Sequence, residues 1–163
     1  MKPKTAQLQI RVTSAEKAAI QRLAGKAAMD MSAYVLSRVL SAPASRFAEC
    51  IEGCKNPESA GYGLAELNSF LSGLSAPELR DAVAAAPSVK LTPYIANYIA
   101  AMVEYACQKQ GVTAPVWTRA IEPLNDPVFA TTLQSLRLHL LTHSPPPFRR
   151  RNIFIDSSLG DRV

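Results

Sequence analysis

Polar and apolar side chains alternate without a break along residues 7–13, and the polar ones are of types that can read DNA bases. In an extended chain the polar residues share one side, and these are Gln7, Gln9 and Arg11. The opposite side carries Leu8, Ile10 and Val12. Glutamine can pair with adenine N6 and N7, and arginine with guanine O6 and N7. The pattern predicts a half-buried strand whose outer face carries side chains of types that can pair with bases.

Two helices are predicted directly after this strand. Thr13 and Glu16 have the spacing of a capping box, and apolar residues then recur at helical spacing to about Ala28. A second helix is expected to begin with Ser32 as its N-cap and to end near Pro43. The strand would therefore be held at the start of a compact helical pair.

A lone strand in such a module has no hydrogen-bond partner, and no later segment reads as a matching strand. If two copies pair their strands antiparallel, the backbone groups find hydrogen-bond partners and the apolar face of each strand is covered. The sequence therefore predicts a homodimer, or a higher assembly, whose dimer core contains Leu8, Ile10 and Val12.

Positive charge is concentrated at the two ends of the 163-residue chain. Residues 1–46 carry eight Lys or Arg residues and two Asp or Glu residues. Residues 47–147 carry six basic and nine acidic residues, and residues 148–163 carry four basic and two acidic residues. A basic first segment beside an acidic middle indicates that the first part meets a polyanion. The alternative is a basic protein whose charges are only solvated.

Residues 5–42 resemble a ribbon–helix–helix DNA-binding module, the class that includes the Arc and MetJ repressors. The resemblance rests on the alternating strand, on the helix start Ser-Ala-Glu-Lys at 14–17, and on Met-Ser-Ala-Tyr-Val at 31–35. It implies that Gln7, Gln9 and Arg11 enter the major groove from a two-stranded ribbon. Many members have a glycine between the helices, but here Gly25 falls earlier and Asp30 occupies the turn.

The same resemblance implies phosphate contacts from the first amides of the second helix, those of Met31, Ser32 and Ala33, because a helix N-terminus suits an anion. Lys2 and Lys4 are also assigned to phosphates. Asp30 is expected to weaken the helix contact, since it brings negative charge to the same place. The structural alternative for the whole segment is an edge strand with a solvated polar face.

The expected fold class is mostly α: an N-terminal ribbon–helix–helix module for dimerisation and DNA binding, then an all-helical domain. The predicted ranges are 1–46 for the module, 47–63 for a linker or helix extension, and 64–163 for a partner-binding domain with a basic tail. Within that domain helices are expected after Ser75, from Thr92 and Pro93 to Gly111, and from Asp126 to Leu141.

The C-terminal part, with Trp117, Asp126-Pro127 and the segment 148–155, resembles the tails of bacterial antitoxin-like regulators that pair with nucleotidyltransferase-type toxins. Its mixture of arginines and apolar residues is typical of interface hot spots. The predicted partner-binding residues are Phe148, Arg149, Arg150, Arg151, Ile153, Phe154 and Ile155. The alternatives are a helical domain used only for oligomerisation and a solvated basic tail.

Cysteines and histidines occur at suggestive spacings that we interpret as packing rather than metal binding. Cys50 and Cys54 are four apart with Cys107 distant, and His139 and His143 are four apart with no third ligand in view. Trp117 is expected to be a core anchor. No catalytic motif is recognisable, so neither an enzyme nor a cofactor is expected.

These patterns predict a cytoplasmic, sequence-specific regulator that binds operator DNA, with no membrane segment. The favoured role is an antitoxin that represses its own operon and neutralises a toxin by direct binding. One alternative is a plain ribbon–helix–helix repressor, in plasmid or operon control, whose C-terminal domain only oligomerises. Another is a dimeric interaction scaffold that does not touch DNA.

Overall fold

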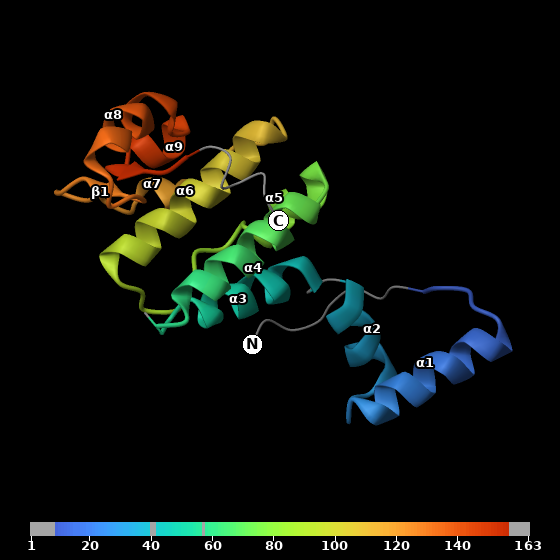
Figure 1. Cartoon of the computed structure of the whole chain (residues 1–163). Helices are drawn as coiled ribbons and strands as arrows, with labels where there is room; N and C mark the ends of the chain where they lie inside the picture. Colours follow the sequence, from blue (N-terminus) through green and yellow to red (C-terminus); the bar gives the residue numbers. More distant parts are fainter. Residues whose placement is uncertain (1–8, 40–41, 57, 157–163) are drawn as a thin grey trace. The chain divides into compact units, whose positions relative to one another are not determined.

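The computed structural model describes residues 9–39, 42–56 and 58–156, and the chain is mostly helical (Figure 1). It divides into two compact units, Met1–Ala42 and Pro43–Val163, called unit 1 and unit 2 below. No helix among the described residues is long and apolar enough to cross a membrane.

Unit 1 contains two helices, α1 (Ser14–Lys26) and α2 (Met31–Val39). The predicted capping box is confirmed at the start of α1, where Glu16 N donates to Thr13 Oγ1 and Thr13 N donates to Glu16 Oε2. The turn after α1 places Ala28 at φ 52°, in the left-handed region where glycine is usual. Its N–H and that of Met29 close the helix by donating to the carbonyls of Gly25 and Ala24.

Unit 2 begins with a run of four helices, two of them capped as predicted. These are α3 (Ala42–Gly53), α4 (Ala60–Gly73), α5 (Ala76–Ala82) and α6 (Pro93–Lys109). Ser75 and Glu78 form a capping box at α5, and Thr92 caps α6 with Pro93 in the first turn. Helix α6 lies at the centre of the unit and contacts α4, α5, α7 (Val116–Arg119) and α9 (Pro146–Arg149).

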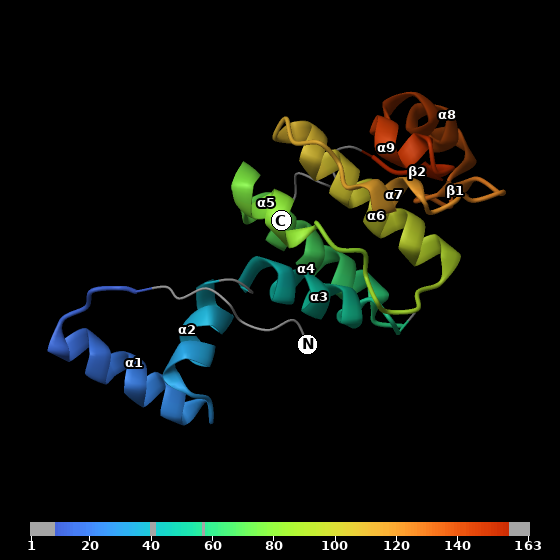
Figure 2. The ribbon, with the colours of Figure 1, turned by 180° about the vertical axis from the view of Figure 1, so that it is seen from behind.

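Helices α3 and α4 approach each other closely because two glycines meet between them, and both views show the helices side by side (Figure 2). A Cβ added at Gly63 would lie 2.8 Å from the carbonyl carbon of Gly53 and 2.9 Å from Cys54 Sγ. The close approach allows Cys50, Cys54 and Leu67 to join one core with the inner side of α6. Gly63 is therefore required for this packing.

The chain after α7 departs from the predicted continuous helix. Strand β1 (Val128–Phe129) precedes helix α8 (Gln134–His143), and β1 pairs in parallel with β2 (Ile153–Phe154). The register joins Val128 to Ile153 and Phe129 to Phe154, and the two phenylalanine rings stack with centroids 4.9 Å apart. The prediction of a helix starting at Asp126 is wrong, because these apolar residues pair with β2 instead of following a helical stripe.

The predicted segment 47–63 lies within the packed part of unit 2. Phe47, Cys50 and Ile51 of α3 are buried in the main core, with at most 4% of their surface exposed. The second compact unit begins at Pro43, so the residues that the sequence assigned to a linker or helix extension, 47–63, belong to it.

Candidate nucleic-acid interface

Residues 9–12 form an exposed segment that belongs to no helix or strand of the described chain. Gln9 and Arg11 are exposed, which leaves their side chains accessible to a ligand. Ile10 and Val12 are also exposed, by 60% and 45%. Lys2, Lys4, Gln7 and Leu8 lie outside the described residues. The predicted strand is therefore absent from the described part of the segment in a single copy.

The described part of unit 1 buries almost no side chain. Of the side chains described in residues 9–36, only that of Ala24 is buried. Large apolar residues at the surface include Leu23, Met29 and Met31, which are 48%, 42% and 37% exposed. A helical pair this small cannot offset its conformational entropy with so little buried apolar area. The exposed side chains of this unit therefore offer an apolar surface that another molecule can cover.

The capping box fixes how the exposed segment joins α1. Thr13 has extended backbone angles, φ −69° and ψ 162°, so the chain turns into the helix at this residue. Hydrogen bonds from the backbone N–H and the hydroxyl of Thr13 lower the pKa of Glu16. Arg11 therefore lies two residues before the N-cap of α1, in an exposed extended segment.

The N-terminus of α2 is capped by Asp30, which corrects the predicted cap at Ser32. Ala33 N donates to Asp30 Oδ1 at 2.9 Å, and Tyr34 N donates to the Asp30 carbonyl at 2.9 Å. A carboxylate stabilises a helix N-terminus, but it occupies the amide of Ala33 and opposes a phosphate there. Met31 and Ser32 are exposed, so their amides are the phosphate candidates that this geometry leaves.

The C-terminal segment predicted to bind a partner lies largely in the core of unit 2. Most of its side chains are less than 9% exposed: Phe148, Arg151, Ile153, Phe154 and Ile155. Phe148 packs edge-on against Tyr98 of α6, with ring centroids 5.2 Å apart. Other elements of the same chain, among them α6 and β1, cover these side chains, so they are not available as a surface in this structure. Arg149 and Arg150 remain exposed.

Arg151 is the centre of a buried polar network rather than a surface charge. Its guanidinium donates to Glu104 Oε1 at 2.7 Å and to Asn97 Oδ1 at 3.0 Å. It also donates to the carbonyls of Thr118 at 2.6 Å and Ile121 at 3.3 Å. The network joins α6, α7 and the C-terminal segment, so the arginine positions the elements that surround it.

The three cysteines behave as packing residues, whereas the two histidines lie at the surface. The cysteines are buried free thiols, and burial raises the pKa of each, that of Cys54 to about 11. His139 and His143 stack with ring centroids 4.0 Å apart, and His139 Nε2 lies 3.4 Å from Asp156 Oδ2. Within the described ranges, no cluster of three His, Cys, Asp or Glu residues could hold a metal ion.

Trp117 lies partly buried against the core, and its indole N–H donates to the Val83 carbonyl at 2.8 Å. This geometry fits the expected core anchor. The sequence interpretation missed the exposure of α8, whose leucines occupy several sides of the helix. That distribution is itself a signal, since a helix packed on one side cannot bury all of them.

Comparison with known proteins adds one family. Residues 2–49 match the model of a NikA-like family described as mobilization protein NikA. The match covers less than a third of the chain and spans the extended segment, α1, α2 and the first turns of α3. No curated protein and no solved structure matches the chain. The similarity supports a DNA-binding regulatory or mobilization protein.

Proposed function

We propose that this protein binds specific DNA sites as a homodimer through residues 1–46. The observation that carries the proposal is the family match over residues 2–49, which coincides with the unit that exposes Gln9 and Arg11. The basic excess of this segment supplies the attraction to a polyanion. The proposed role is binding, not catalysis.

The dimer is proposed because unit 1 exposes the apolar residues that a second strand would cover. Pairing residues 7–13 of two copies antiparallel would satisfy their backbone groups and bury Ile10 and Val12. Replacing Ile10 with lysine would then place an unpaired charge in the seam, at a cost of several kcal/mol, about 3–5. Ile10→Lys should therefore abolish dimers in sedimentation equilibrium. Val116→Lys, at an 82% exposed site in unit 2, is the control that should leave them intact.

Base reading is tested by comparing Arg11 with Arg22, an exposed arginine on α1. Arg11→Ala should cost about 1–3 kcal/mol on duplexes selected from a random library, with relaxed preference at one position per half-site. Arg22→Ala should weaken selected and random DNA alike, if it acts at all. Equal losses on both kinds of DNA for Arg11→Ala would refute base contact, and binding without salt dependence would favour the non-DNA scaffold.

Two finer roles fit this DNA-binding core. In the first, the protein is an antitoxin that represses its own operon while unit 2 holds a toxin, of the nucleotidyltransferase type that the resemblance of the C-terminal part implies. In the second, it serves DNA mobilization, which the description of the matched family favours. A plain repressor, whose unit 2 only oligomerises, is the simplest alternative.

The roles differ in measurable partners. Co-purification of the full chain with the product of an adjacent gene, together with rescue of cells from that product, would support the antitoxin role. A drop in plasmid transfer on deletion of the gene, restored by the full chain, would support mobilization. Repression of its own promoter with neither effect would leave the plain repressor.

A further inference from the structure

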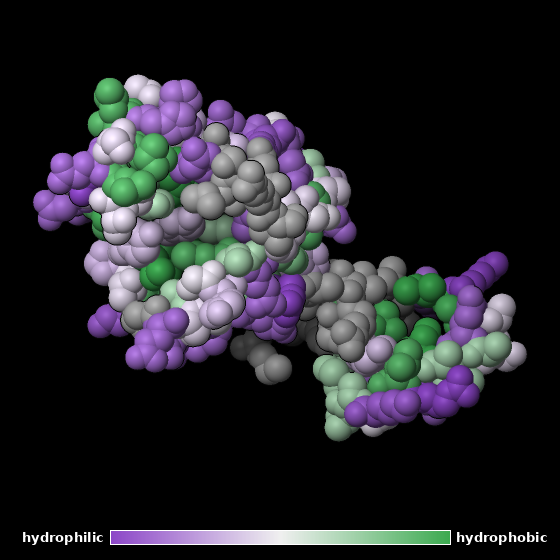
Figure 3. Space-filling view, viewed as in Figure 1, coloured by the Kyte–Doolittle hydropathy of each residue, from purple (hydrophilic) through white to green (hydrophobic). Residues whose placement is uncertain are grey.

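A groove of about 840 Å³ lies in unit 2 between the start of α6, residues 92–97, and the segment 121–128, and it is called the α6 groove below. Its volume is within the range of about 300–1,000 Å³ that is usual for ligand sites. Unit 2 shows both hydrophobic and hydrophilic residues at its surface (Figure 3), and the lining of the groove combines the two kinds. The family match at residues 2–49 does not reach this groove, and DNA binding does not use it.

A buried amide joins the two walls of the α6 groove. Asn97 is 1% exposed, and its Nδ2 donates to the Pro93 carbonyl at 3.0 Å and to the Glu122 carbonyl at 2.9 Å. The Oδ1 of the same side chain accepts from the guanidinium of Arg151 at 3.0 Å. The groove is therefore built on the buried polar network around Arg151, which fixes the distance between its walls.

The backbone at residues 151 and 152 holds the second wall at three further points. Leu124 N donates to the Arg151 carbonyl at 3.4 Å, and the Leu124 carbonyl accepts from Asn152 Nδ2 at 2.5 Å. Val128 N donates to the Asn152 carbonyl at 2.8 Å. A wall that is already fixed in this way need not be ordered when a ligand binds, which lowers the cost of binding.

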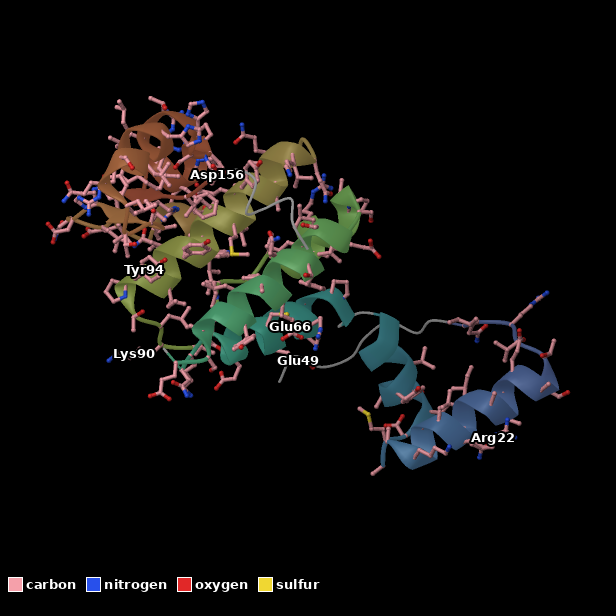
Figure 4. All side chains as sticks on the ribbon, viewed as in Figure 1. Arg22, Glu49, Glu66, Lys90, Tyr94 and Asp156 are labelled. Atoms are coloured by element: carbon pink, nitrogen blue, oxygen red, sulfur yellow. The ribbon has the colours of Figure 1, made fainter. Side chains whose placement is uncertain are left out.

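The side chains that line the α6 groove include an aromatic ring and two carboxylates. Tyr94, in the first turn of α6, is 36% exposed, and its ring packs on Tyr98 with centroids 5.8 Å apart. Glu122 and Asp126 are exposed on the other wall. Among the described residues, no lysine or arginine forms an ion pair with either carboxylate. Figure 4 shows Lys90 and Tyr94 near the start of α6, but Lys90 does not line the groove.

An arginine side chain suits this lining better than other charged groups do. Its planar guanidinium can donate two parallel hydrogen bonds to a carboxylate and can lie on an aromatic ring, whereas a lysine ammonium acts as a point charge. The apolar part of the lining, which includes Pro93, Pro123 and Leu124, would cover the aliphatic stem and its neighbours. The carboxylates would repel the phosphates of DNA, so a nucleic acid does not fit this groove.

We propose that the α6 groove docks an arginine-bearing segment of a partner protein, with the guanidinium between Tyr94 and the carboxylates of Glu122 and Asp126. A segment of chain would also cover the apolar lining, which a small free cation would leave in water. The inference goes beyond DNA binding by unit 1 and does not depend on it. It gives unit 2 a partner surface outside the largely buried segment 148–155.

The experiment selects peptides of about 12 residues from a random displayed library, in parallel on the full wild-type chain and on the variant Glu122→Gln with Asp126→Asn. Arginine beside proline or aliphatic residues should be enriched on the wild type and not on the variant. The most enriched peptide is then labelled for fluorescence anisotropy. Replacing its arginine by citrulline, which has a similar shape without the charge, should weaken binding at least about fivefold, and lysine should restore only part of the loss.

Variants of the α6 groove should affect the arginine peptide specifically. Glu122→Gln with Asp126→Asn should weaken it at least about fivefold, and Tyr94→Leu about threefold. Neither change should weaken the citrulline peptide as much, because the lost contacts are those of the guanidinium. Nuclear magnetic resonance shifts on addition of the peptide to the wild-type chain should concentrate at residues 92–97 and 121–128.

Glu58→Gln with Asp81→Asn is the matched control, because it makes the same change of charge at two exposed carboxylates of unit 2 that do not line the groove. Leu138→Gln, at a 72% exposed site of α8, tests whether the peptide binds an apolar surface elsewhere. Both controls should leave peptide binding unchanged. Circular dichroism melts check that each variant is folded, and binding to selected DNA is measured in parallel, so that failure of the DNA-binding proposal is seen separately.

Four results would overturn the inference. The first is a selection without arginine enrichment, and the second is an equal loss of peptide binding in the groove variant and its matched control. The third is displacement of the peptide by free argininamide or spermidine at concentrations similar to its own, which would assign the groove to a small cation. The fourth is a tetramer in sedimentation equilibrium that Glu122→Gln with Asp126→Asn dissolves into dimers, which would assign it to a second copy.

Discussion

Replacing Arg151 with methionine tests whether this buried arginine holds unit 2 together. Its side chain is 5% exposed, and it makes four hydrogen bonds, one of them to a Glu104 carboxylate that is itself only 11% exposed. Methionine keeps much of the volume of the side chain but removes every donor. The carboxylate of Glu104 would then keep only the exposed Arg150, whose Nη2 lies 3.8 Å away, and would lie beside three oxygens that have lost a partner.

The expected loss in the free energy of unfolding follows from that geometry. Removing the buried partner of an ion pair costs about 3–5 kcal/mol, because the remaining charge stays buried and the solvated Arg150 at 3.8 Å compensates it only weakly. A small domain is stable by only about 5–15 kcal/mol, so the loss is a large share of the total. At about 3–5 °C per kcal/mol for a unit of this size, the melting temperature should fall by about 10–20 °C.

The assay is urea and thermal unfolding followed by circular dichroism, with Arg150→Met as the control. Arg150 is the same residue type, adjoins Arg151 in sequence and faces the same carboxylate, but its side chain is 70% exposed and lies 3.8 Å away. Its replacement should cost less than about 1 kcal/mol. The double variant Arg151→Met with Glu104→Met should recover much of the loss, since neither charge is then left unpaired. Equal effects of the two arginine substitutions would refute the proposed role of the network.

Three further predictions concern packing, thiol reactivity and pH. Gly63→Ala should destabilise unit 2 by about 1–3 kcal/mol through overpacking, whereas Gly61→Ala, which meets nothing within 4 Å, should be neutral or stabilising; equal urea midpoints would contradict this. Ellman's reagent at pH 8 should label no cysteine of the native protein within minutes and three in urea, because burial raises their thiol pKa values; rapid labelling without urea would show that the core opens. Hydrogen bonds from Ser75 lower the pKa of Glu78 below its ordinary 4.5, so its carboxylate stabilises α5 above that pH and the gain is lost as pH falls through the lower, folded value. Glu78→Gln should reduce the difference between melts at pH 7 and pH 3, and an unchanged difference would count against the capping box as its source.

Local signals predicted helix starts well. Thr13 with Glu16, Ser75 with Glu78, and Thr92 with Pro93 each mark a helix start that the structure contains, because capping depends on residues only a few positions apart. The N-cap of α2 was assigned to Ser32 instead of Asp30 for a related reason. Two polar residues near the start of α2 can both cap in principle, and sequence alone did not decide that the side chain of Asp30, not that of Ser32, accepts from Ala33.

Contacts between residues far apart in the chain could not be predicted from local sequence patterns. Arg151 looks like part of a basic surface run, and only the fold brings Asn97, Glu104 and Thr118 around it. Likewise, Ile153 and Phe154 read as an exposed apolar patch until β1 supplies their partners. The base-reading residues Gln7, Gln9 and Arg11 stay a prediction, since their role depends on a second copy and on DNA.

The parallel pairing of β1 with β2 has a consequence for how the protein is made. The apolar side of α6 is covered in part by Phe148, and the buried strand that follows reaches Ile155, 46 residues after α6 ends at Lys109. At about 5–20 residues per second, the ribosome needs about 2–9 s to synthesise that stretch. Throughout this interval the nascent unit exposes the part of α6 that Phe148 later covers, together with a Glu104 carboxylate that still lacks Arg151. Unit 2 therefore completes its core late in synthesis, and chaperones that recognise exposed apolar helices have a defined window in which to bind it.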